Sequence, residues 1–204
     1  MSVNPVEYPV LEAIRDRWSP YRWRPMVVED EKLLQCLEAA RWAASSFNDQ
    51  PWYFIVAQRQ HRDAFQQAIE CLAEPNQQWA QHTGVLILTV IRTTFAKNNQ
   101  PNRVALHDLG QAAAHLTLQA TAVGLSVHQM AGVNLSKVRQ TYGIPEGFEP
   151  QTGIAIGYAD TSEPTGEDEQ DLRAREKTAR QRIPLSEQVF AGKWERPASL
   201  VTPT

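Results

Sequence analysis

The chain has 204 residues, 42% hydrophobic and 21% charged, which is an ordinary composition for one globular domain. Its formal net charge of -3 gives no electrostatic reason to expect nucleic acid or an anionic membrane as a partner. The N-terminus lacks a basic segment followed by an apolar run, and the longest apolar run is too short to cross a bilayer, so we expect a cytoplasmic protein.

The first half of the chain predicts helices around one strand. Residues 9–17 have helical spacing, and this helix ends before Pro20, because the residue that precedes a proline is disfavoured in the α conformation. The acidic residues 29–31 mark the start of a second helix, since negative charge stabilises a helix N-terminus. Aromatic and β-branched residues at 52–56 predict a strand, and the apolar spacing at 61–72 predicts a third helix.

The second half contains the two strongest patterns. Residues 85–91 are almost continuously apolar, which predicts a central strand buried on both faces. Between Leu106 and Val123 apolar residues recur every three or four positions, which predicts a long helix closed by Gly124. Because this helix is apolar nearly all round, we expect it to lie in a large core or in a subunit interface. A short helix at 134–142 and a glycine-bearing strand at 152–158 follow.

The C-terminal region is too polar to predict a core of its own. Residues 160–171 indicate an acidic linker, 172–190 a basic arm that starts as a helical or extended segment, and 191–204 a polar tail. Strands and helices do not alternate strictly, so the order of elements predicts an α+β fold with one mixed sheet in a single domain, 1–190. We expect the polar chain from Ile183 onward to wrap a neighbouring subunit or to close an edge of the sheet.

Two arginine clusters are candidates for an anion site. Arg17 and Ser19 lie at the end of the first predicted helix, and Arg180 and Arg182 lie near the C-terminus. The planar guanidinium group donates directional, charge-assisted hydrogen bonds to phosphate. Each cluster is also compatible with a solvated basic face, so the residues alone leave both interpretations open.

Two polar segments could contact a ligand. One contains Ser45, Ser46 and Asn48, and by itself it is typical of turn chemistry, because Ser and Asn often bond the backbone just after a helix. The other runs from Gln129 to Gly132, where an amide side chain is followed by a glycine that permits close backbone approach. This second segment is equally typical of a simple connection between a helix and a strand.

Several other chemistries lack their sequence signals. No His-x-x-x-His or Cys-x-x-Cys spacing occurs, so no metal site is expected. No Gly-x-Ser-x-Gly elbow and no Gly-x-Gly-x-x-Gly loop occurs, which argues against an ordinary α/β hydrolase and against a Rossmann crevice. Cys36 and Cys71 lie in apolar helical patterns and are interpreted as reduced core residues, with one disulfide left open.

Five segments in order resemble the FMN-dependent nitroreductase family. They are RDRWSP, ARWAASSFNDQPW, HDLGQAAAHLTLQATAVGLSVHQMAG, GIPEGFE with IAIGYAD, and RQRIPLSEQV. The resemblance implies an intertwined α+β homodimer with two FMN sites at the subunit interface. It also implies a ping-pong cycle in which electrons pass from NADH or NADPH to FMN and then to a nitroaromatic or quinone. FMN, rather than a catalytic side chain, would carry the chemistry.

The resemblance implies a set of cofactor-binding residues as well. Arg17 and Ser19 would contact the phosphate and ribityl chain, with the backbone of Trp18, and Arg180 and Arg182 would complete the phosphate site. The other implied contacts come from a loop that reaches the partner's FMN, an asparagine at the isoalloxazine edge and a backbone segment near flavin N5: Ser45, Ser46, Asn48, Asn76, Gln129, Met130, Ala131 and Gly132.

Three positions depart from the family pattern, and one of them, Ala44 in place of a frequent proline, is a small change in loop rigidity. Tyr21, also expected at the cofactor, stands where the family often has arginine or lysine, and Trp79 stands where some members have lysine. Positive charge there stabilises reduced flavin, so its loss would lower the reduction potential unless Arg22 substitutes. This motivates an alternative function, a flavin-binding protein with little turnover that serves storage or sensing. A non-flavin alternative is a helical dimerisation module.

Overall fold

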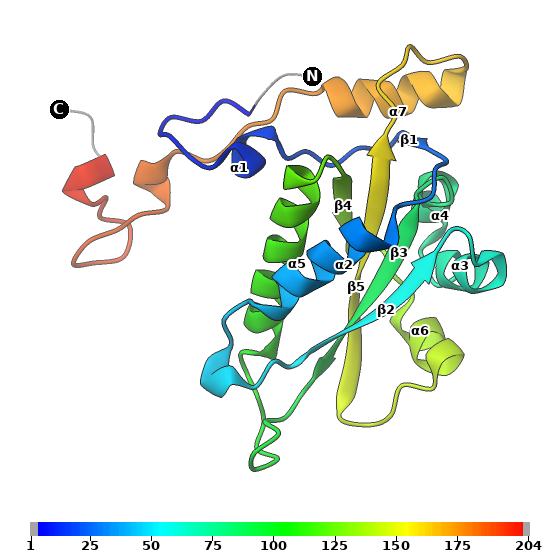
Figure 1. Ribbon diagram of the computed structural model, residues 1–204. Helices are drawn as coiled ribbons and strands as arrows, with labels where there is room; N and C mark the ends of the chain where they lie inside the picture. The colour runs from blue at the N-terminus through cyan, green and yellow to red at the C-terminus, as the bar shows by residue number, and fades with distance from the viewer. Residues whose placement is uncertain (1–3, 202–204) are drawn as a thin grey trace.

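The computed structural model describes residues 4–201 and shows an α+β fold in which helices cover an antiparallel sheet (Figure 1). Within this range, the sheet has five strands: β1 (Trp23–Arg24), β2 (Trp52–Gln58), β3 (Val85–Arg92), β4 (Ser126–Met130) and β5 (Phe148–Ala159). Their order is β1-β5-β3-β2, and β4 also pairs with β5. The long strand β5 therefore pairs with β1, β3 and β4.

Every strand pairing among residues 4–201 is antiparallel, so the expectation of a mixed sheet is wrong for this part of the chain. The apolar run of β3 is confirmed as a strand buried on both faces, a pattern that is more typical of parallel sheets. In this fold the burial comes from helices on both faces. Between β2 and β3 the chain passes through α3 (Arg62–Ile69) and α4 (Glu74–Ala80) and reverses direction. The hydrophobic pattern of a strand does not specify whether its neighbour runs parallel or antiparallel.

The sheet separates two hydrophobic cores. One core lies beneath α2 (Asp30–Arg41) and α5 (Ala105–Ala122) and includes Ile87 of β3. The other lies beneath α3, α4 and α6 (Leu135–Tyr142) and includes Leu86. Neighbouring residues of one strand thus serve opposite cores, as the alternation of side chains along a strand requires.

The two faces of α5 differ in burial. Ala112 and Leu116 are fully buried against the sheet and α2, whereas Leu106 is 58% exposed and Ala114 also faces outward. The predicted long helix and its left-handed cap at Gly124, with φ of 80°, are confirmed. Within one chain, however, only one face of this apolar helix is covered.

Between residues 4 and 201, no helix combines the length and apolarity needed to cross a membrane.

The main correction to the predicted elements concerns the C-terminal region. Residues 160–171 do not form a continuous linker, because helix α7 (Glu167–Lys177) begins inside them. Glu167, Asp168 and Glu169 occupy its first turn, where negative charge stabilises the helix dipole. The acidic residues that suggested a linker are therefore a helix start.

Smaller corrections concern the ends and number of elements. The first helix, α1 (Glu12–Asp16), is shorter than the predicted 9–17. The strand β1 and the helix α4 were not predicted, although Pro75 at the start of α4 suits that position. The cap of α6 is as expected from the sequence, since the Asn134 side chain accepts a hydrogen bond from the Lys137 amide.

The two cysteines are separate core residues. Cys36 lies in the core beneath α2, and Cys71 lies in the core on the other face of the sheet. Both are free and fully buried, so the disulfide that the sequence left open is not formed.

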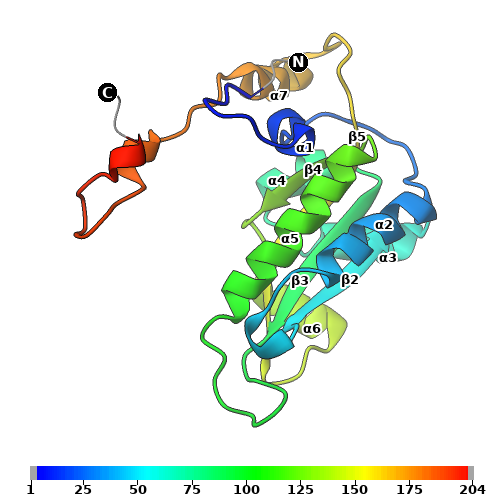
Figure 2. The same cartoon turned by 60° about the vertical axis from the view of Figure 1, so that its left-hand side comes forward.

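After α7 the chain leaves the main body, as both views show (Figures 1 and 2). Phe190 and Pro197 form an isolated bridge there, and the Phe190 ring lies 5.1 Å from the Trp194 ring. Trp194 is 81% exposed and Leu200 is 78% exposed. The predicted tail, 191–204, lies in this segment, and its last three residues fall outside the described range.

Candidate functional site

Three arginines from the two ends of the chain meet beside α1. Arg17 Nη1 donates a hydrogen bond to Ser19 Oγ at 3.1 Å, and Arg180 Nη1 donates to the carbonyl oxygen of Arg17 at 3.0 Å. Burial lowers the pKa of Arg17, and the positive charges of Arg180 and Arg182 lower it further. We call Arg17, Ser19, Arg180 and Arg182 the basic corner. Trp18, which lies between Arg17 and Ser19 in the sequence, is half-buried. Repulsion among the charges of Arg17, Arg180 and Arg182 makes the basic corner a favourable place for an anion.

A cavity of about 310 Å³ opens beside the basic corner. Arg17, Ser19 and Ile14 of α1 line one part of it. Side chains of α5 and β4 line the rest, among them Thr117, Leu118 and Gln129. Gln129 Nε2 donates to Thr117 Oγ1 at 2.9 Å, which fixes the orientation of this amide. Cations next to an apolar wall with one oriented amide suit a flat organic ligand that carries an anionic group.

Met130 is the last residue of β4, and its side chain lies on the face of the sheet opposite the cavity. Met130 is buried in the core beneath α3 and α4, and Ala131 is exposed. The Gly132 carbonyl oxygen accepts hydrogen bonds from the Ala73 amide at 2.9 Å and from Asn76 Nδ2 at 3.1 Å. A Cβ atom at Gly132 would collide with the Asn76 amide, so glycine permits this approach. The structure brings Asn76 and Gly132 together.

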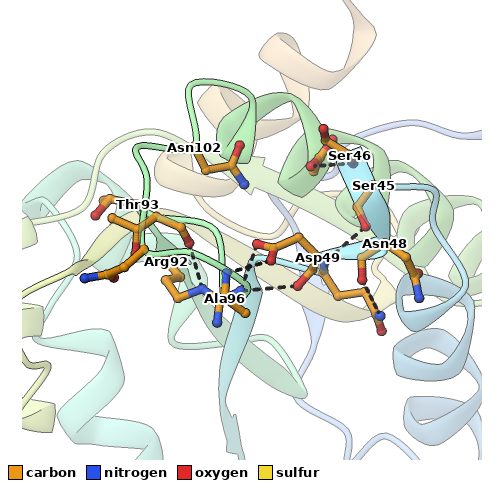
Figure 3. A network of polar contacts seen from close by, with 12 residues as sticks. Ser45, Ser46, Asn48, Asp49, Arg92, Thr93, Ala96 and Asn102 are labelled. Carbon is orange, nitrogen blue, oxygen red and sulfur yellow. Dashed lines mark hydrogen bonds and ion pairs between the residues drawn. The ribbon is translucent and has the colours of Figure 1, made fainter.

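The polar loop, residues 45–50, is held mainly by its own chain (Figure 3). Ser45 Oγ accepts a hydrogen bond from the Gln50 amide at 3.0 Å. The Ser46 amide donates to Asp108 Oδ2 at 3.1 Å, so the loop is tied to the first turn of α5. Asn48 is exposed. Of the three residues predicted to bind a cofactor here, Asn48 has the most solvent-facing side chain.

An ion pair anchors the polar loop to the end of β3. Asp49 Oδ2 lies 2.8 Å from Arg92 Nη2, and Asp49 Oδ1 accepts a hydrogen bond from the Ala96 amide at 2.8 Å (Figure 3). The Asp49 side chain is 6% exposed. Phe47 and Asn48 have φ of 55° and 54°, a left-handed conformation that asparagine tolerates but that is strained for the bulky phenylalanine. The surrounding contacts therefore impose the shape of the loop.

Within one chain, the basic corner and the polar loop lie at different ends of α5. The cavity at the corner borders Ala114 and Leu118, whereas Ser46 contacts Asp108. These positions are six to ten residues apart, which along a helix is about 9–15 Å. Figure 2 shows α1 near the C-terminal end of α5 and the polar loop near its N-terminal end.

Tyr21 and Trp79 lie on the face of the sheet opposite the cavity. Their ring centroids are 5.6 Å apart, and both rings contact His128, at 4.7 and 4.5 Å respectively. Arg22 is 4% exposed, and its Nη2 lies 3.4 Å from a carboxylate oxygen of Asp160. The structure does not bring the Tyr21 side chain to the cavity, and the charge of Arg22 is already compensated.

Two acidic residues organise these regions although the sequence analysis did not single them out. Asp108, 2% exposed, holds the Ser46 amide and is the only acidic residue of α5. A lone acid in an apolar helix is a signal that could have identified it. Glu176, whose side chain is 1% exposed, accepts hydrogen bonds from the amides of Tyr21 and Arg22. No pattern points to Glu176, because its partners are backbone groups far away in the sequence.

Comparison with known proteins identifies the family. A sequence model described as Nitroreductase family matches residues 14–158, more than half of the chain. The chain therefore belongs to the nitroreductase family.

Three relatives illustrate the similarity. A crystal structure described as an oxidoreductase containing FMN is 33% identical, with a TM-score of 0.83 over 93% of this chain and 95% of its own. A nitroreductase family protein from Clostridium difficile 630 is 25% identical, with a TM-score of 0.68 over 91% of this chain and 99% of its own. A Methanothermobacter thermautotrophicus protein, provisionally named an NADH dehydrogenase/NAD(P)H nitroreductase, is 25% identical over 73% of this chain and 76% of its own.

Proposed function

We propose that this protein is an FMN-dependent oxidoreductase that takes electrons from NADH or NADPH and passes them to a small nitroaromatic- or quinone-like acceptor in the cytoplasm. The observation that carries the proposal is the basic corner, which opens into a cavity between α5 and β4. Family membership and the similar oxidoreductase that contains FMN support FMN as the cofactor. The name of the Methanothermobacter relative supports a nicotinamide donor.

FMN suits the chemistry of the residues around the cavity. Its phosphate would lie among Arg17, Arg180 and Arg182, because burial and the two neighbouring arginines lower the pKa of Arg17 and an anion there offsets the repulsion among the three charges. The Ser19 hydroxyl and the oriented Gln129 amide would contact its polar groups, and the apolar side chains of α5 would cover its ring. Bound FMN would supply hydride and electron transfer, while the protein binds and orients it and limits access of water.

A second copy of the chain would complete the site. The predicted cofactor residues Ser45, Ser46 and Asn48 lie at the other end of α5 from the cavity of their own chain. A two-fold axis across the exposed face of α5 would bring the loop of one subunit to the basic corner of the other. The exposed apolar side chains of α5 and of the C-terminal segment, such as Leu106 and Trp194, would be covered in such a homodimer.

We propose that the donor and the acceptor bind in turn at the same place. Two planar substrates that exchange electrons with one cofactor need only one position beside it, at the wall that α5 and β4 form. A ping-pong cycle follows, in which the oxidised nicotinamide leaves before the acceptor enters. The residues that line the cavity would orient each planar substrate in succession.

An absorbance spectrum under anaerobic conditions tests this function. We expect purified protein to show flavin absorbance that bleaches within minutes after addition of NADH or NADPH, and to recover when a quinone is added. Flavin absorbance that neither nicotinamide bleaches would contradict the oxidoreductase. A colourless protein that fails to bind added FMN would contradict the cofactor itself and favour the dimerisation module.

Light scattering tests the homodimer independently. We expect twice the mass of one chain, because the uncovered apolar face of α5 needs a partner. A monomer whose circular dichroism still shows folded helices would contradict the dimer.

One observation favours a second candidate function, a flavin-binding protein with little turnover. Tyr21 and Trp79 pack in the core opposite the cavity, and Arg22 is paired with Asp160, so none of these positions offers positive charge to a bound flavin. Without that charge the reduced flavin is less stabilised. Bound FMN that stays oxidised with both nicotinamides is the result that this candidate predicts.

A further inference from the structure

Helix α7 lies outside the region that matches the family, yet it contacts the segment that carries the basic corner. The match covers residues 14–158, and α7 begins at Glu167. We propose that Glu176 of α7 is a positioning residue that holds residues 17–22 in the shape that presents Arg17 and Ser19 to the phosphate of FMN. This inference rests on the proposed function, because it assumes that FMN is the ligand of the basic corner.

The hydrogen bonds of Glu176 are the main evidence. Its Oε1 atom accepts hydrogen bonds from the backbone amides of Tyr21 and Arg22, both at 2.8 Å. Successive amides that converge on one anionic oxygen form a backbone nest, and bonds to an ionised acceptor are stronger than neutral ones. The Glu176 side chain is 1% exposed, so solvent does not weaken these bonds. A single carboxylate therefore fixes two consecutive peptide units next to the basic corner.

Other contacts hold the same segment but do not replace this one. His128 Nδ1 lies 2.8 Å from the carbonyl oxygen of Pro20, and the Asp160 amide donates to the carbonyl oxygen of Arg22 at 2.9 Å. These contacts engage carbonyl groups, whereas Glu176 engages the amides. Loss of its carboxylate would leave two N–H groups without their acceptor, one of them on the buried Arg22.

The charge of Glu176 is paired within α7, although its Oε2 atom accepts no hydrogen bond in the described part of the chain. Its Oε2 atom lies 3.6 Å from Arg173 Nη1, one turn earlier in α7. The Arg175 guanidinium lies 5.7 Å from the centre of the Tyr21 ring, a second contact of α7 with this segment. Glu176 therefore acts through the backbone of residues 17–22 and not by direct contact with phosphate.

Binding of FMN and riboflavin to the full-length apoprotein tests the proposal, because riboflavin lacks the phosphate. We expect Glu176→Ala to weaken FMN about tenfold and riboflavin much less. Glu176→Gln should keep most of the FMN affinity, since its amide oxygen can still accept hydrogen bonds. Glu167→Ala is the matched control, because Glu167 is exposed in the first turn of the same helix, and it should change neither affinity.

Four results would overturn the proposal. Unchanged FMN affinity in Glu176→Ala overturns it alone, and so does an equal loss for both flavins, which indicates a merely structural role. A wild-type protein that binds no FMN overturns the proposed function as well. Hydrogen exchange in the wild type guards against a variant that fails to fold: the amides of Tyr21 and Arg22 should be protected, and exchange as fast as in an exposed loop contradicts the role of Glu176.

Discussion

The basic corner and the polar loop are the two halves of the proposed site, and they are prepared for a ligand in different ways. The corner gathers like charges, and the pKa of Arg17 is lowered by burial and by its two arginine neighbours. The loop gathers internal bonds, since Ser45, Ser46 and Asp49 each have a partner within the chain. At the corner, an anion would therefore relieve repulsion among like charges. In the loop, hydrogen bonds and an ion pair already fix the backbone conformation before any ligand binds.

This difference shows how one chain can divide the work of binding. A preformed loop loses little conformational entropy when a ligand binds, so it adds specificity at low cost. The positive charges gathered at the corner supply affinity instead, because charge-assisted hydrogen bonds to phosphate are strong. Substitutions in the loop should thus affect stability and fine contacts, while substitutions in the corner should affect affinity.

The largest effect is expected from the ion pair that shapes the loop. Asp49→Ala leaves Arg92 without its carboxylate and removes the acceptor of the Ala96 amide. We expect the free energy of unfolding to fall by about 3 kcal/mol in urea denaturation at constant m value. Glu38→Ala is the control, because Glu38 pairs with Arg41 on the exposed surface, and its effect should be much smaller. Equal losses in the two variants would contradict a special role of Asp49.

Arg17→Ala should produce the next largest effect and should act on affinity rather than on stability. We expect FMN to bind about a hundredfold more weakly in a fluorescence titration, since a charged hydrogen-bond donor to phosphate is lost. Removal of one of three like charges should leave the thermal midpoint of the apoprotein unchanged or slightly raised. Arg15→Ala is the control, because Arg15 pairs with Asp16 at the exposed end of α1. Similar affinities in the two variants would break the contrast between corner and loop.

Much of the fold could be predicted because hydrophobic periodicity reports burial. The spacing of α5 and the apolar run of β3 both specify elements that the structure confirms. Strand direction was predicted wrongly, because a strand buried on both faces has the same composition in a parallel and in an antiparallel sheet. The start of α7 was missed because acidic residues are typical both of linkers and of helix N-termini.

The candidate site could be predicted only in part, because local patterns do not specify distant contacts. The Arg17 and Ser19 pair and the Arg180 and Arg182 pair were both candidates, and the structure brings them together. The role of Glu176 in that meeting was not predictable, since its partners are amides about 155 residues away in the sequence. Tyr21 was expected at the cofactor by its position in the sequence, but its side chain points to the opposite core. The predicted binding roles await the experiments above.

A smaller effect is expected at Asn48, and it separates contact from backbone strain. Asn48→Gly removes the amide but tolerates the left-handed φ of 54°, whereas Asn48→Ala also strains the backbone. We expect both variants to weaken FMN about fivefold while light scattering still shows a dimer. Only the alanine variant should also lose about 1 kcal/mol of stability. If Asn48→Gly keeps full FMN affinity, the polar loop is a structural turn and does not serve the partner's cofactor.

The smallest effect is expected from the pH dependence of the basic corner, through His128. Burial lowers the pKa of His128 below its ordinary value of 6.5, and the charge of Arg17 lowers it further, although the Pro20 carbonyl and Glu176 oppose this. Below about pH 6.5 the unfolded chain therefore binds a proton at His128 that the folded chain does not. The folded state must lose stability in that acidic window.

Thermal unfolding of the apoprotein between about pH 7.5 and about pH 5.5 checks this prediction. The midpoint of the wild type should fall more steeply with acid than that of His128→Gln, in which the other histidines still titrate. Saturating FMN should reduce the difference, because its phosphate offsets the charge of Arg17 that helps to hold His128 neutral. If FMN leaves the difference between wild type and His128→Gln unchanged, the phosphate does not lie at the basic corner. The electrostatic role that we assign to the corner would then be wrong.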